Sequence, residues 1–375
     1  MKYYIIAGEA SGDLHGSNLI KELVKQEARS EIRCWGGDLM ENAGAKVVKH
    51  YRELAFMGFT EVIKNLPTIL NNISFCKKDI ESFQPDAIIL IDYPGFNLRI
   101  AKWAKLKGLK VIYYISPQIW AWKENRIHNI KKYVDKMLVI LPFEKSFYEK
   151  WNYSVDYVGH PLVEVIDNFI ENYKKNKSEW VHHKTIALLP GSRKQEILQK
   201  LPIMLEVTKH FKEYQFIVAK APSVEDSFYA SILDDFENVS TVSNKTYELL
   251  YHSSAALVTS GTATLETALF GVPEIICYKG GNLSYQIAKR LIKIKFIGLV
   301  NLIMNKEVVK ELIQHELNKE NLIHELQLLL HDDNRKNQIN EDYKQLKSLL
   351  SKGGHASQNA ASIILQFMQA NAPTI

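Results

Sequence analysis

Residues suited to binding an anion gather in a short loop near the start of the 375-residue sequence. The loop GEASGD at 8–13 follows a short apolar run and precedes a helical pattern. Its glycines, Gly12 among them, let the backbone approach a ligand, and the N–H groups at a helix start favour an anion. Glu9 and Ser11 add polar side chains there. The alternative is a tight strand-to-helix turn capped by Asp13, because the loop matches neither the dinucleotide fingerprint nor a P-loop.

Two more loops of this kind occur in the second half of the chain, PGSR at 190–193 and SGTATLE at 260–266. Arg193 could neutralise a diphosphate through two hydrogen bonds, and Glu266 lies one helical turn after Thr262, where it could accept hydrogen bonds from ribose hydroxyls. The alternative is a surface arginine and a solvated helix carboxylate. Together the loops predict a nucleotide-diphosphate site. Its expected residues are Gly191, Ser192, Arg193, Ser260, Gly261, Thr262 and Glu266.

A carboxylate suited to acid–base chemistry follows the strongly apolar run at 87–91. Asp92 ends this run and is followed by Tyr93, Pro94 and Gly95. A carboxylate at the carboxyl-terminal tip of a buried parallel strand is a plausible general base, because ligands of open α/β sheets bind at that edge. The alternative is that Asp92 caps local backbone in the turn before Pro94. Asn97 is expected to cap the helix that follows. His15 and His160 fall in similar places, and for both we favour a structural role over proton transfer.

No metal ligand set is evident in the sequence. It holds no Asp-x-Asp pair, no HExxH motif and no cysteine cluster, since Cys34, Cys76 and Cys277 are scattered. We therefore expect no metal and no cofactor. A departing diphosphate would be stabilised by helix N-termini and Arg193.

An apolar stretch from Phe56 to Ile73 has helical spacing, with Pro67 inside it and Lys64 nearby. If exposed, the stretch would be an interfacial membrane patch; if buried, it belongs to the core. The sequence leaves both open. The lysine and arginine pairs at 131–132 and 289–290 would suit acidic headgroups. The residues of the expected membrane patch are Phe56, Met57, Phe59, Val62, Ile63 and Leu66.

These loops need strands and helices to hold them, and the sequence alternates short β-branched runs with longer helical patterns. This alternation predicts parallel sheets covered by helices on both faces. Six strands are expected in the first half and five in the second, with helical segments from Lys306 onward and a final helix near 357–369. We expect a linker at 166–183, a first domain at 1–165 and a second at 184–350. The expected strands are 3–7, 31–35, 87–91, 110–114, 136–140, 154–158, 185–189, 215–218, 239–242, 255–258 and 274–278.

Length and composition agree with two α/β domains of the Rossmann-like, doubly wound type, with a cleft between them. A chain of 375 residues is too long for one ordinary hydrophobic core. The net charge of +5 inclines the surface toward phosphates or acidic lipids but is too weak to indicate nucleic acid. No apolar run approaches the roughly 20 residues of a membrane span, and the N-terminus lacks a signal-peptide pattern. We expect a cytoplasmic protein.

The motifs together resemble one family, the lipid A disaccharide synthases, along nearly the whole chain. No single motif is specific, but their order and coverage are. The matching segments are GEASGD (8–13), ELAFMGFTEV (53–62), IDYPGFN (91–97), SPQIWAW (116–122), LPFEKSFY (141–148), GHPL (159–162), LLPGSRKQEI (188–197), SGTATLE (260–266) and AKRLIK (288–293).

The resemblance implies an inverting transferase of the GT-B fold that acts without a metal. UDP-2,3-diacylglucosamine would donate its sugar to 2,3-diacylglucosamine 1-phosphate, giving a β-1,6-linked disaccharide and UDP. By resemblance, Asp92 is the base, Glu9 and its loop form the acceptor side, and Arg193, Glu266 and Asn301 hold the nucleotide. The patch around Met57 would meet the anionic surface of the inner membrane. The final helix, 355–370, would pack back on the first domain.

Two departures from the family pattern stand out: Gly95 replaces an acidic residue often found there, and Val300 replaces a proline frequent before Asn301. An enzyme alternative is a UDP-N-acetylglucosamine 2-epimerase or another GT-B transferase, since fold alone does not give function. A different class is a non-catalytic nucleotide-sugar sensor or membrane scaffold. The sequence leaves a monomer and a homodimer both open.

Overall fold

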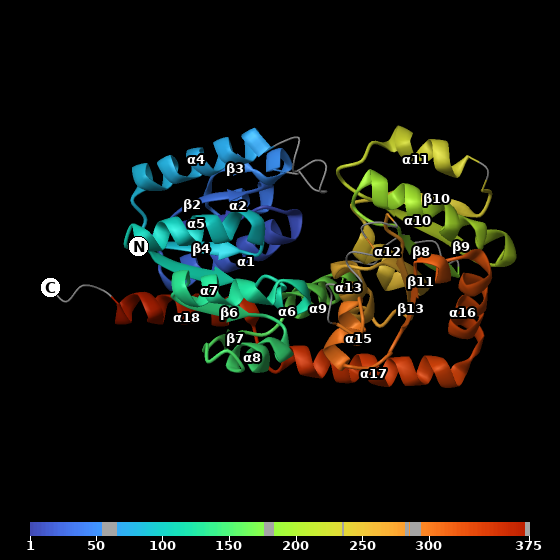
Figure 1. The fold of residues 1–375 in the computed structure, drawn as a ribbon. Helices are drawn as coiled ribbons and strands as arrows, with labels where there is room; N and C mark the ends of the chain where they lie inside the picture. Colours follow the sequence, from blue (N-terminus) through green and yellow to red (C-terminus); the bar gives the residue numbers. More distant parts are fainter. Residues whose placement is uncertain (55–65, 176–183, 235, 282–284, 286–293, 372–375) are drawn as a thin grey trace. The chain divides into compact units, whose positions relative to one another are not determined.

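The chain divides into two compact units, which are described separately. The computed structural model describes residues 1–54, 66–175, 184–234, 236–281, 285 and 294–371 (Figure 1). Unit 1 comprises Met1–Pro161 and Ser351–Ile375, and unit 2 comprises Leu162–Leu350. Unit 1 is therefore discontinuous in sequence.

Unit 1 is built on a seven-stranded parallel sheet in the order β3-β2-β1-β4-β5-β6-β7. The central strands β1 and β4 are continuous apolar runs because both faces of the sheet are covered. Ala7 at the end of β1 pairs with Ile91 at the end of β4, so the loops that follow begin side by side. The strands are β1 Lys2–Ala7, β2 Glu31–Gly36, β3 Lys46–His50, β4 Ala87–Ile91, β5 Lys110–Tyr114, β6 Lys136–Val139 and β7 Asp156–Tyr157.

Helices cover both faces of this sheet. Helices α4, α5, α7 and α8 contribute to one hydrophobic cluster with strand residues such as Tyr4 and Leu90. Helix α1 packs against α18, where Ser362 donates a hydrogen bond to the Gln26 side chain. The helices are α1 Ala10–Gln26, α2 Asp38–Asn42, α4 Leu66–Phe83, α5 Pro94–Leu106, α6 Ile119–Trp122, α7 Ile127–Tyr133, α8 Pro142–Glu149 and α18 Ala356–Ala370, with short 3-10 helices η1 Tyr51–Leu54 and η2 Glu124–Arg126.

Unit 2 has a six-stranded parallel sheet in the order β10-β9-β8-β11-β12-β13. Leu189 at the end of β8 pairs with Val258 in β11, so the loops after these strands also lie at one edge. The strands are β8 Thr185–Leu189, β9 Gln215–Lys220, β10 Val239–Ser243, β11 Ser253–Thr259, β12 Glu274–Tyr278 and β13 Lys310–Ile313. The helices are α9 Pro161–Lys175, α10 Lys194–Glu206, α11 Asp226–Leu233, α12 Thr246–His252, α13 Thr262–Leu269, α15 Leu299–Met304, α16 Lys319–His331 and α17 Asp333–Ser351, with η3 Thr208–His210 and η4 Gln314–Glu316.

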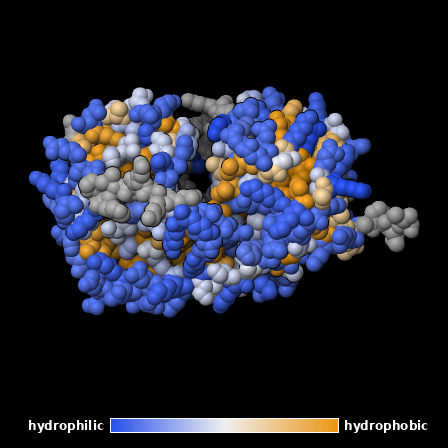
Figure 2. Space-filling view, turned by 180° about the vertical axis from the view of Figure 1, so that it is seen from behind, coloured by the Kyte–Doolittle hydropathy of each residue, from blue (hydrophilic) through white to orange (hydrophobic). Residues whose placement is uncertain are grey.

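Hydrophilic residues cover most of the face shown in Figure 2, with hydrophobic residues in patches between them. Among the described residues, no helix combines the length and the apolar character that crossing a bilayer requires.

The two-sheet α/β class is confirmed, but some expected elements were wrong. Residues 166–175, expected as a linker, belong to helix α9, in which Leu162 and Ile166 are buried in the unit 2 core with Ile170 packed against it. That four-residue spacing is an amphipathic pattern hidden among charged residues. Residues 176–183 lie outside the described part of the chain.

Two strands were not expected at all. β3 and β13 are edge strands with polar residues in them, KVVKH and KELI. The segment after residue 306 was predicted to be helical, yet β13 pairs with β12 from Ile275 to Tyr278. Short polar edge strands depend on pairing with a neighbour more than on their own pattern, so the tertiary structure decides them.

The points where the chain leaves and re-enters unit 1 lie against each other. A Cβ atom on Gly353 would lie 2.3 Å from the backbone nitrogen of Gly159, and one on Gly159 would lie 2.9 Å from the carbonyl oxygen of Gly354. Such contacts with backbone atoms leave no room for a side chain. Asn359 of α18 also donates a hydrogen bond to the carbonyl oxygen of Val158 at 3.2 Å.

Candidate functional site

The unit 1 site forms where β1 and β4 end side by side. Glu9 follows β1 and stands at the N-cap position of α1, and Asp92 follows β4 directly. The two carboxylates are close enough that the charge of Glu9 raises the pKa of Asp92. The structure thus brings together two of the residues predicted from the sequence, one for the base and one for the acceptor side.

Asp92 has an unusual backbone conformation that its neighbours stabilise. Its φ is +43° and that of Tyr93 is +48°, a region that non-glycine residues seldom occupy. The carbonyl oxygen of Asp92 accepts hydrogen bonds from Asn97 Nδ2 at 2.8 Å and from the Tyr113 hydroxyl at 2.5 Å. Strain of this kind persists where the surroundings over-determine it, which is common at functional sites.

The pKa of the Asp92 carboxyl group is raised toward neutrality. Burial and, second, the negative charge of Glu9 raise it from 3.8 to about 7, although a hydrogen bond from the Tyr93 backbone opposes the rise. A base whose pKa is close to the working pH can take up a proton and still be largely ionised. Perturbed carboxylates of this type are more frequent at functional sites than elsewhere, although structural networks produce them too.

The rest of the 8–13 loop is tightly packed on one side and open on the other. A Cβ atom on Gly8 would lie 2.4 Å from Cγ of Tyr93, so this position has no room for a side chain. Gly12 is buried, while Ser11 is exposed. Asp13 does not cap α1 as expected; its carboxylate accepts hydrogen bonds from the backbone of Gly37, Leu39 and Met40 and so caps α2.

Three further polar residues of unit 1, Asn97, His15 and His160, are buried. Asn97 was expected to cap the helix after Asp92, but its side chain instead donates to the carbonyl oxygens of Ile91 and Asp92. His15 and His160 are buried, and burial lowers their pKa values to about 4 and about 3. Both histidines are therefore neutral at pH 7.

The loop 190–193 of unit 2 ends at the start of α10. Gly191 has φ +124°, and Arg193 stands at the N-cap position of α10 with about half of its side chain exposed. Glu196 folds back onto this loop: it accepts from the guanidinium at 3.1 Å and from the backbone N–H of Ser192 at 3.3 Å. An anionic group thus already interacts with these donors, as the electrostatics of a helix N-terminus favour.

The loop 260–266 continues into α13 at the neighbouring strand end. Gly261 and Thr262 are exposed, whereas the Ser260 hydroxyl donates to the carbonyl oxygen of Ile297 at 3.0 Å. Glu266 accepts a hydrogen bond from the Tyr247 hydroxyl at 2.8 Å. Burial raises the pKa of Glu266, and the bond from Tyr247 opposes this. Glu266 is thus a held, half-buried carboxylate and not the freely solvated one of the alternative interpretation.

Asn301 is placed differently from the other expected nucleotide ligands. It is buried in α15, where Nδ2 donates to Val309 O and Glu311 Oε1, and Oδ1 accepts from the N–H groups of Val308 and Val309. Both donors and both lone pairs of the amide are therefore used inside the protein. This arrangement favours a supporting role over direct contact with a nucleotide.

The expected membrane patch lies almost wholly outside the described residues. Phe56, Met57, Phe59, Val62 and Ile63 fall in 55–65, and Leu66 begins α4 without a described side chain. Further along α4, Ile73 is buried, whereas Leu70 is 53% exposed and Phe75 is 47% exposed.

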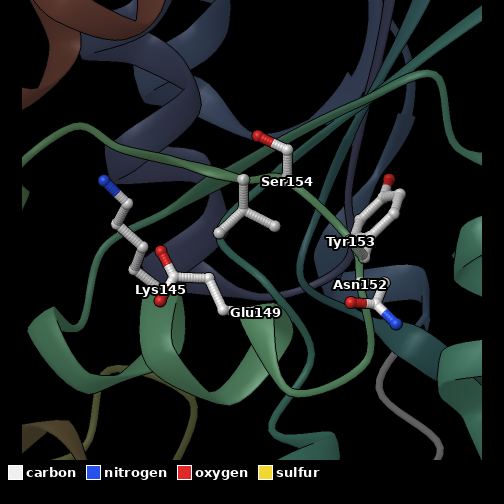
Figure 3. Close-up of a pocket in the computed structure, with 6 residues that line it drawn as sticks. Lys145, Glu149, Asn152, Tyr153 and Ser154 are labelled. Carbon is white, nitrogen blue, oxygen red and sulfur yellow. The ribbon is translucent and has the colours of Figure 1, made fainter.

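A separate pocket of about 300 Å³ lies between α8 and the chain leading to β7 (Figure 3). It is lined by Lys145, Glu149, Asn152, Tyr153, Ser154 and Val155. None of the predicted site residues lines it. The described residues contain no group of three or more His, Cys, Asp or Glu side chains that could hold a metal ion.

Several residues that build the site were missed from the sequence. Tyr113 and Tyr247 belong to a buried strand and to an amphipathic helix, where aromatic residues normally serve packing. Their hydroxyl groups meet Asp92 and Glu266 only through tertiary contacts. Glu196 was missed too, but the sequence did contain a signal for it, because it lies three residues after Arg193 at a helix start, a spacing at which opposite charges pair.

Comparison with solved structures shows the class to which this fold belongs. The UDP-GlcNAc 2-epimerase from Neisseria meningitidis bound to UDP-GlcNAc matches with a TM-score of 0.69 at 15% identity, covering 99% of this chain and 100% of that one. The glycotransferase of kitacinnamycin matches with a TM-score of 0.65 at 12% identity, covering 97% and 98%. The chain has the GT-B fold of two Rossmann-like units.

Sequence comparison then shows the family. The model of the lipid-A-disaccharide synthetase family matches residues 3–367. Lipid-A-disaccharide synthase of Syntrophus aciditrophicus is 39% identical over 373 residues, with 97% of both chains covered. Lipid-A-disaccharide synthase of Coxiella burnetii is 36% identical, with 96% of both covered. The chain belongs to the lipid-A-disaccharide synthase family, and it is a glycosyltransferase of lipid A disaccharide synthesis.

Proposed function

We propose that the chain transfers 2,3-diacylglucosamine from UDP-2,3-diacylglucosamine to the 6-hydroxyl of 2,3-diacylglucosamine 1-phosphate, with inversion at the transferred carbon. The observation that carries the proposal is the pair Glu9 and Asp92 at neighbouring strand ends, with the pKa of Asp92 raised to about 7. The family membership supports the reaction, and the two carboxylates support the role of unit 1 in it.

In the proposed reaction, Asp92 takes the proton of the acceptor hydroxyl as the oxygen attacks the anomeric carbon of the donor. A new carbon–oxygen bond forms there while the bond to the diphosphate breaks, and UDP leaves with the bonding electrons. Glu9, Ser11 and Gly12 form the acceptor side of this site. Because Glu9 raises the pKa of Asp92, it makes Asp92 a stronger base.

Unit 2 holds the donor nucleotide in this proposal. Arg193 pairs with the diphosphate, joined by backbone N–H groups of Gly191 and Ser192 and by those of Ser260, Gly261 and Thr262 at the start of α13. Glu266, held by Tyr247, accepts hydrogen bonds from the ribose. Asn301 supports the site through Glu311. The charge that develops on the leaving diphosphate is stabilised by these donors and Arg193, and no metal is required.

The same proposal places the protein in the cytoplasm at the anionic surface of the inner membrane, where both acylated substrates reside. The stretch from Phe56 to Leu66 would bind there. Flotation with vesicles that contain anionic lipid at low salt tests this: a Met57→Glu variant should float less than the wild type, and equal flotation would contradict the role of the stretch. The proposal holds for a monomer and for a homodimer, which sedimentation velocity distinguishes.

The decisive experiment is a mass-spectrometric assay of disaccharide formation from the two diacylated substrates. Asp92→Asn should lower turnover by about 10²- to 10⁴-fold, the usual contribution of a general base. Asp86→Asn is the matched control, because Asp86 precedes the same strand at its opposite end and bonds to the backbone of Lys2. Unchanged turnover in Asp92→Asn would remove Asp92 as the base, and product from non-acylated sugar nucleotide alone would favour an epimerase.

A further inference from the structure

A group of cationic and aromatic residues follows β5, next to the strand that carries Asp92. Trp122 ends α6, Lys123 comes next, and Arg126 ends η2; we refer to these three residues as the 122–126 cluster. Tyr114 at the end of β5 pairs with Ile91 at the end of β4. The cluster therefore follows a strand that ends at the same edge of the sheet as Asp92.

The two cations of the cluster lie close together and lack an acidic partner. The Lys123 ammonium lies 4.1 Å from the centre of the Trp122 ring, and the Arg126 guanidinium lies 5.9 Å from it. Within the described part of the chain, neither cation forms an ion pair. Glu124 stands between them in sequence, but its carboxylate accepts a hydrogen bond from the indole of Trp151 at 3.2 Å.

Electrostatics show that this arrangement disfavours both charges. Burial lowers the pKa of Lys123, and the charge of Arg126 lowers it further. Burial likewise lowers the pKa of Arg126, which is half-buried. Arg126 is thus partly out of water beside the exposed Lys123, and the free-energy cost of two neighbouring like charges is one that a bound anion would offset.

The cluster also connects to the base. The charge of Arg126 acts on the phenol of Tyr113, and the Tyr113 hydroxyl donates to the carbonyl oxygen of Asp92 at 2.5 Å. Only one buried side chain thus separates Arg126 from the loop of Asp92. The acceptor of the proposed reaction carries its reacting 6-hydroxyl and its 1-phosphate on the two carbons that flank the ring oxygen, C5 through C6 and C1, so its phosphate must lie within a few bonds of the hydroxyl and near the base.

We propose that the 122–126 cluster binds the 1-phosphate of the acceptor sugar, with Arg126 and Lys123 as its ligands. This rests on the proposed function. A phosphate monoester carries a charge of about −1.5 to −2 at pH 7. A guanidinium binds phosphate oxygens through two parallel hydrogen bonds, and an ammonium adds a point charge. The cluster selects the phosphorylated acceptor and orients its hydroxyl toward Asp92.

The test compares the phosphorylated acceptor with the same acylated sugar lacking its 1-phosphate. For the wild type, kcat/KM should be about 10- to 100-fold higher with the phosphate, as one charge-assisted contact provides. In Arg126→Ala this preference should fall about tenfold or more, mainly through KM of the phosphorylated acceptor, while KM of the donor stays unchanged. Arg126→Lys should restore part of the preference. Lys132→Ala is the matched control, because Lys132 also lies over a ring, that of Tyr133, and is exposed.

A second measurement needs no turnover. The ³¹P signal of water-soluble glucosamine 1-phosphate should broaden with the wild type and with Lys132→Ala, but not with the Lys123→Ala, Arg126→Ala double variant. If the wild type makes no disaccharide, the proposed function fails, and the ³¹P measurement alone decides on the phosphate site. Equal broadening by the double variant, or an unchanged preference for phosphate in Arg126→Ala, overturns the inference. Loss of binding to anionic vesicles with the preference retained would also overturn it, since the cluster would then contact membrane headgroups.

Discussion

Replacing Glu9 with Gln isolates the electrostatic part of the proposed mechanism. The change keeps the size and the hydrogen-bonding reach of the side chain but removes its negative charge from beside Asp92. Burial is the largest cause of the raised pKa of Asp92, and Glu9 is the second. Removing the second cause should lower the pKa of Asp92 from about 7 by on the order of one unit.

The sign of the effect follows from the base role. Asp92 acts in its ionised form, so the acid limb of the pH profile of kcat/KM reports its pKa and should move to lower pH in Glu9→Gln. At pH 6, a base of pKa 7 is about 9% ionised and a base of pKa 6 about 50%, so the active fraction rises roughly fivefold. At pH 8, both enzymes are nearly fully ionised, and the lower basicity of Asp92 should make the variant slower there.

The assay is disaccharide formation across roughly pH 5 to pH 9, with the position of the acid limb as the readout. The position is informative even if Glu9 also contacts the acceptor, because a lost contact lowers the whole profile without shifting it. Glu31→Gln is the control, since Glu31 is exposed and pairs with Lys2 at the far end of β1. An acid limb that stays in place, or moves to higher pH, would refute the coupling of the two carboxylates.

Three more outcomes are expected. Asp92→Asn should raise the unfolding temperature at pH 8 but not below pH 4. The pKa of Asp92 rises from 3.8 to about 7 on folding, so the folded protein loses stability as the pH climbs through that window. Thermal scans of both proteins at the two pH values check this, and the same difference at both would contradict the raised pKa. Arg193→Ala should weaken UDP binding about 10- to 100-fold by calorimetry, whereas Lys194→Ala, which loses a surface pair with Glu225 and a contact with the Phe228 ring, should not. Gly353→Ala should destabilise unit 1, because its Cβ would lie 2.3 Å from a backbone nitrogen; a wild-type denaturation midpoint would show that the two chain segments move apart easily.

Much of the fold could be predicted because the central strands are buried on both faces. Runs such as Ala87–Ile91 and Thr185–Leu189 are continuous and apolar, which only a covered sheet accommodates. The edge strand Lys310–Ile313 carried no such signal, because two charged residues are followed by two apolar ones and the polar–apolar alternation of a strand is absent. Helix α9 was overlooked because its charged residues obscured the spacing of Leu162, Ile166 and Ile170.

The site could be predicted in position but not in chemistry. The position of Asp92 could be predicted because it follows an apolar strand directly, and the carboxyl ends of parallel strands form the edge of the sheet where ligands bind. Its pKa depends on burial and on Glu9, which is 83 positions away in the sequence, so no local pattern reveals it. The same limit explains why the roles of Asp13 and Asn301 could not be predicted. Their side chains accept hydrogen bonds from the backbone of other segments, so Asp13 does not cap α1 and the Asn301 amide is not free for a ligand.

The discontinuity of unit 1 sets an order for events during synthesis. Residues 162–350 form unit 2 and leave the ribosome before α18, the partner of the first helix, has been translated. Unit 1 therefore remains incomplete while unit 2 is synthesised, with the apolar side of α1 uncovered until residues 351–375 emerge. A premature stop shortly before Ala356 would leave a finished C-terminal half attached to an N-terminal half without its closing helix, a product that quality-control proteases should remove.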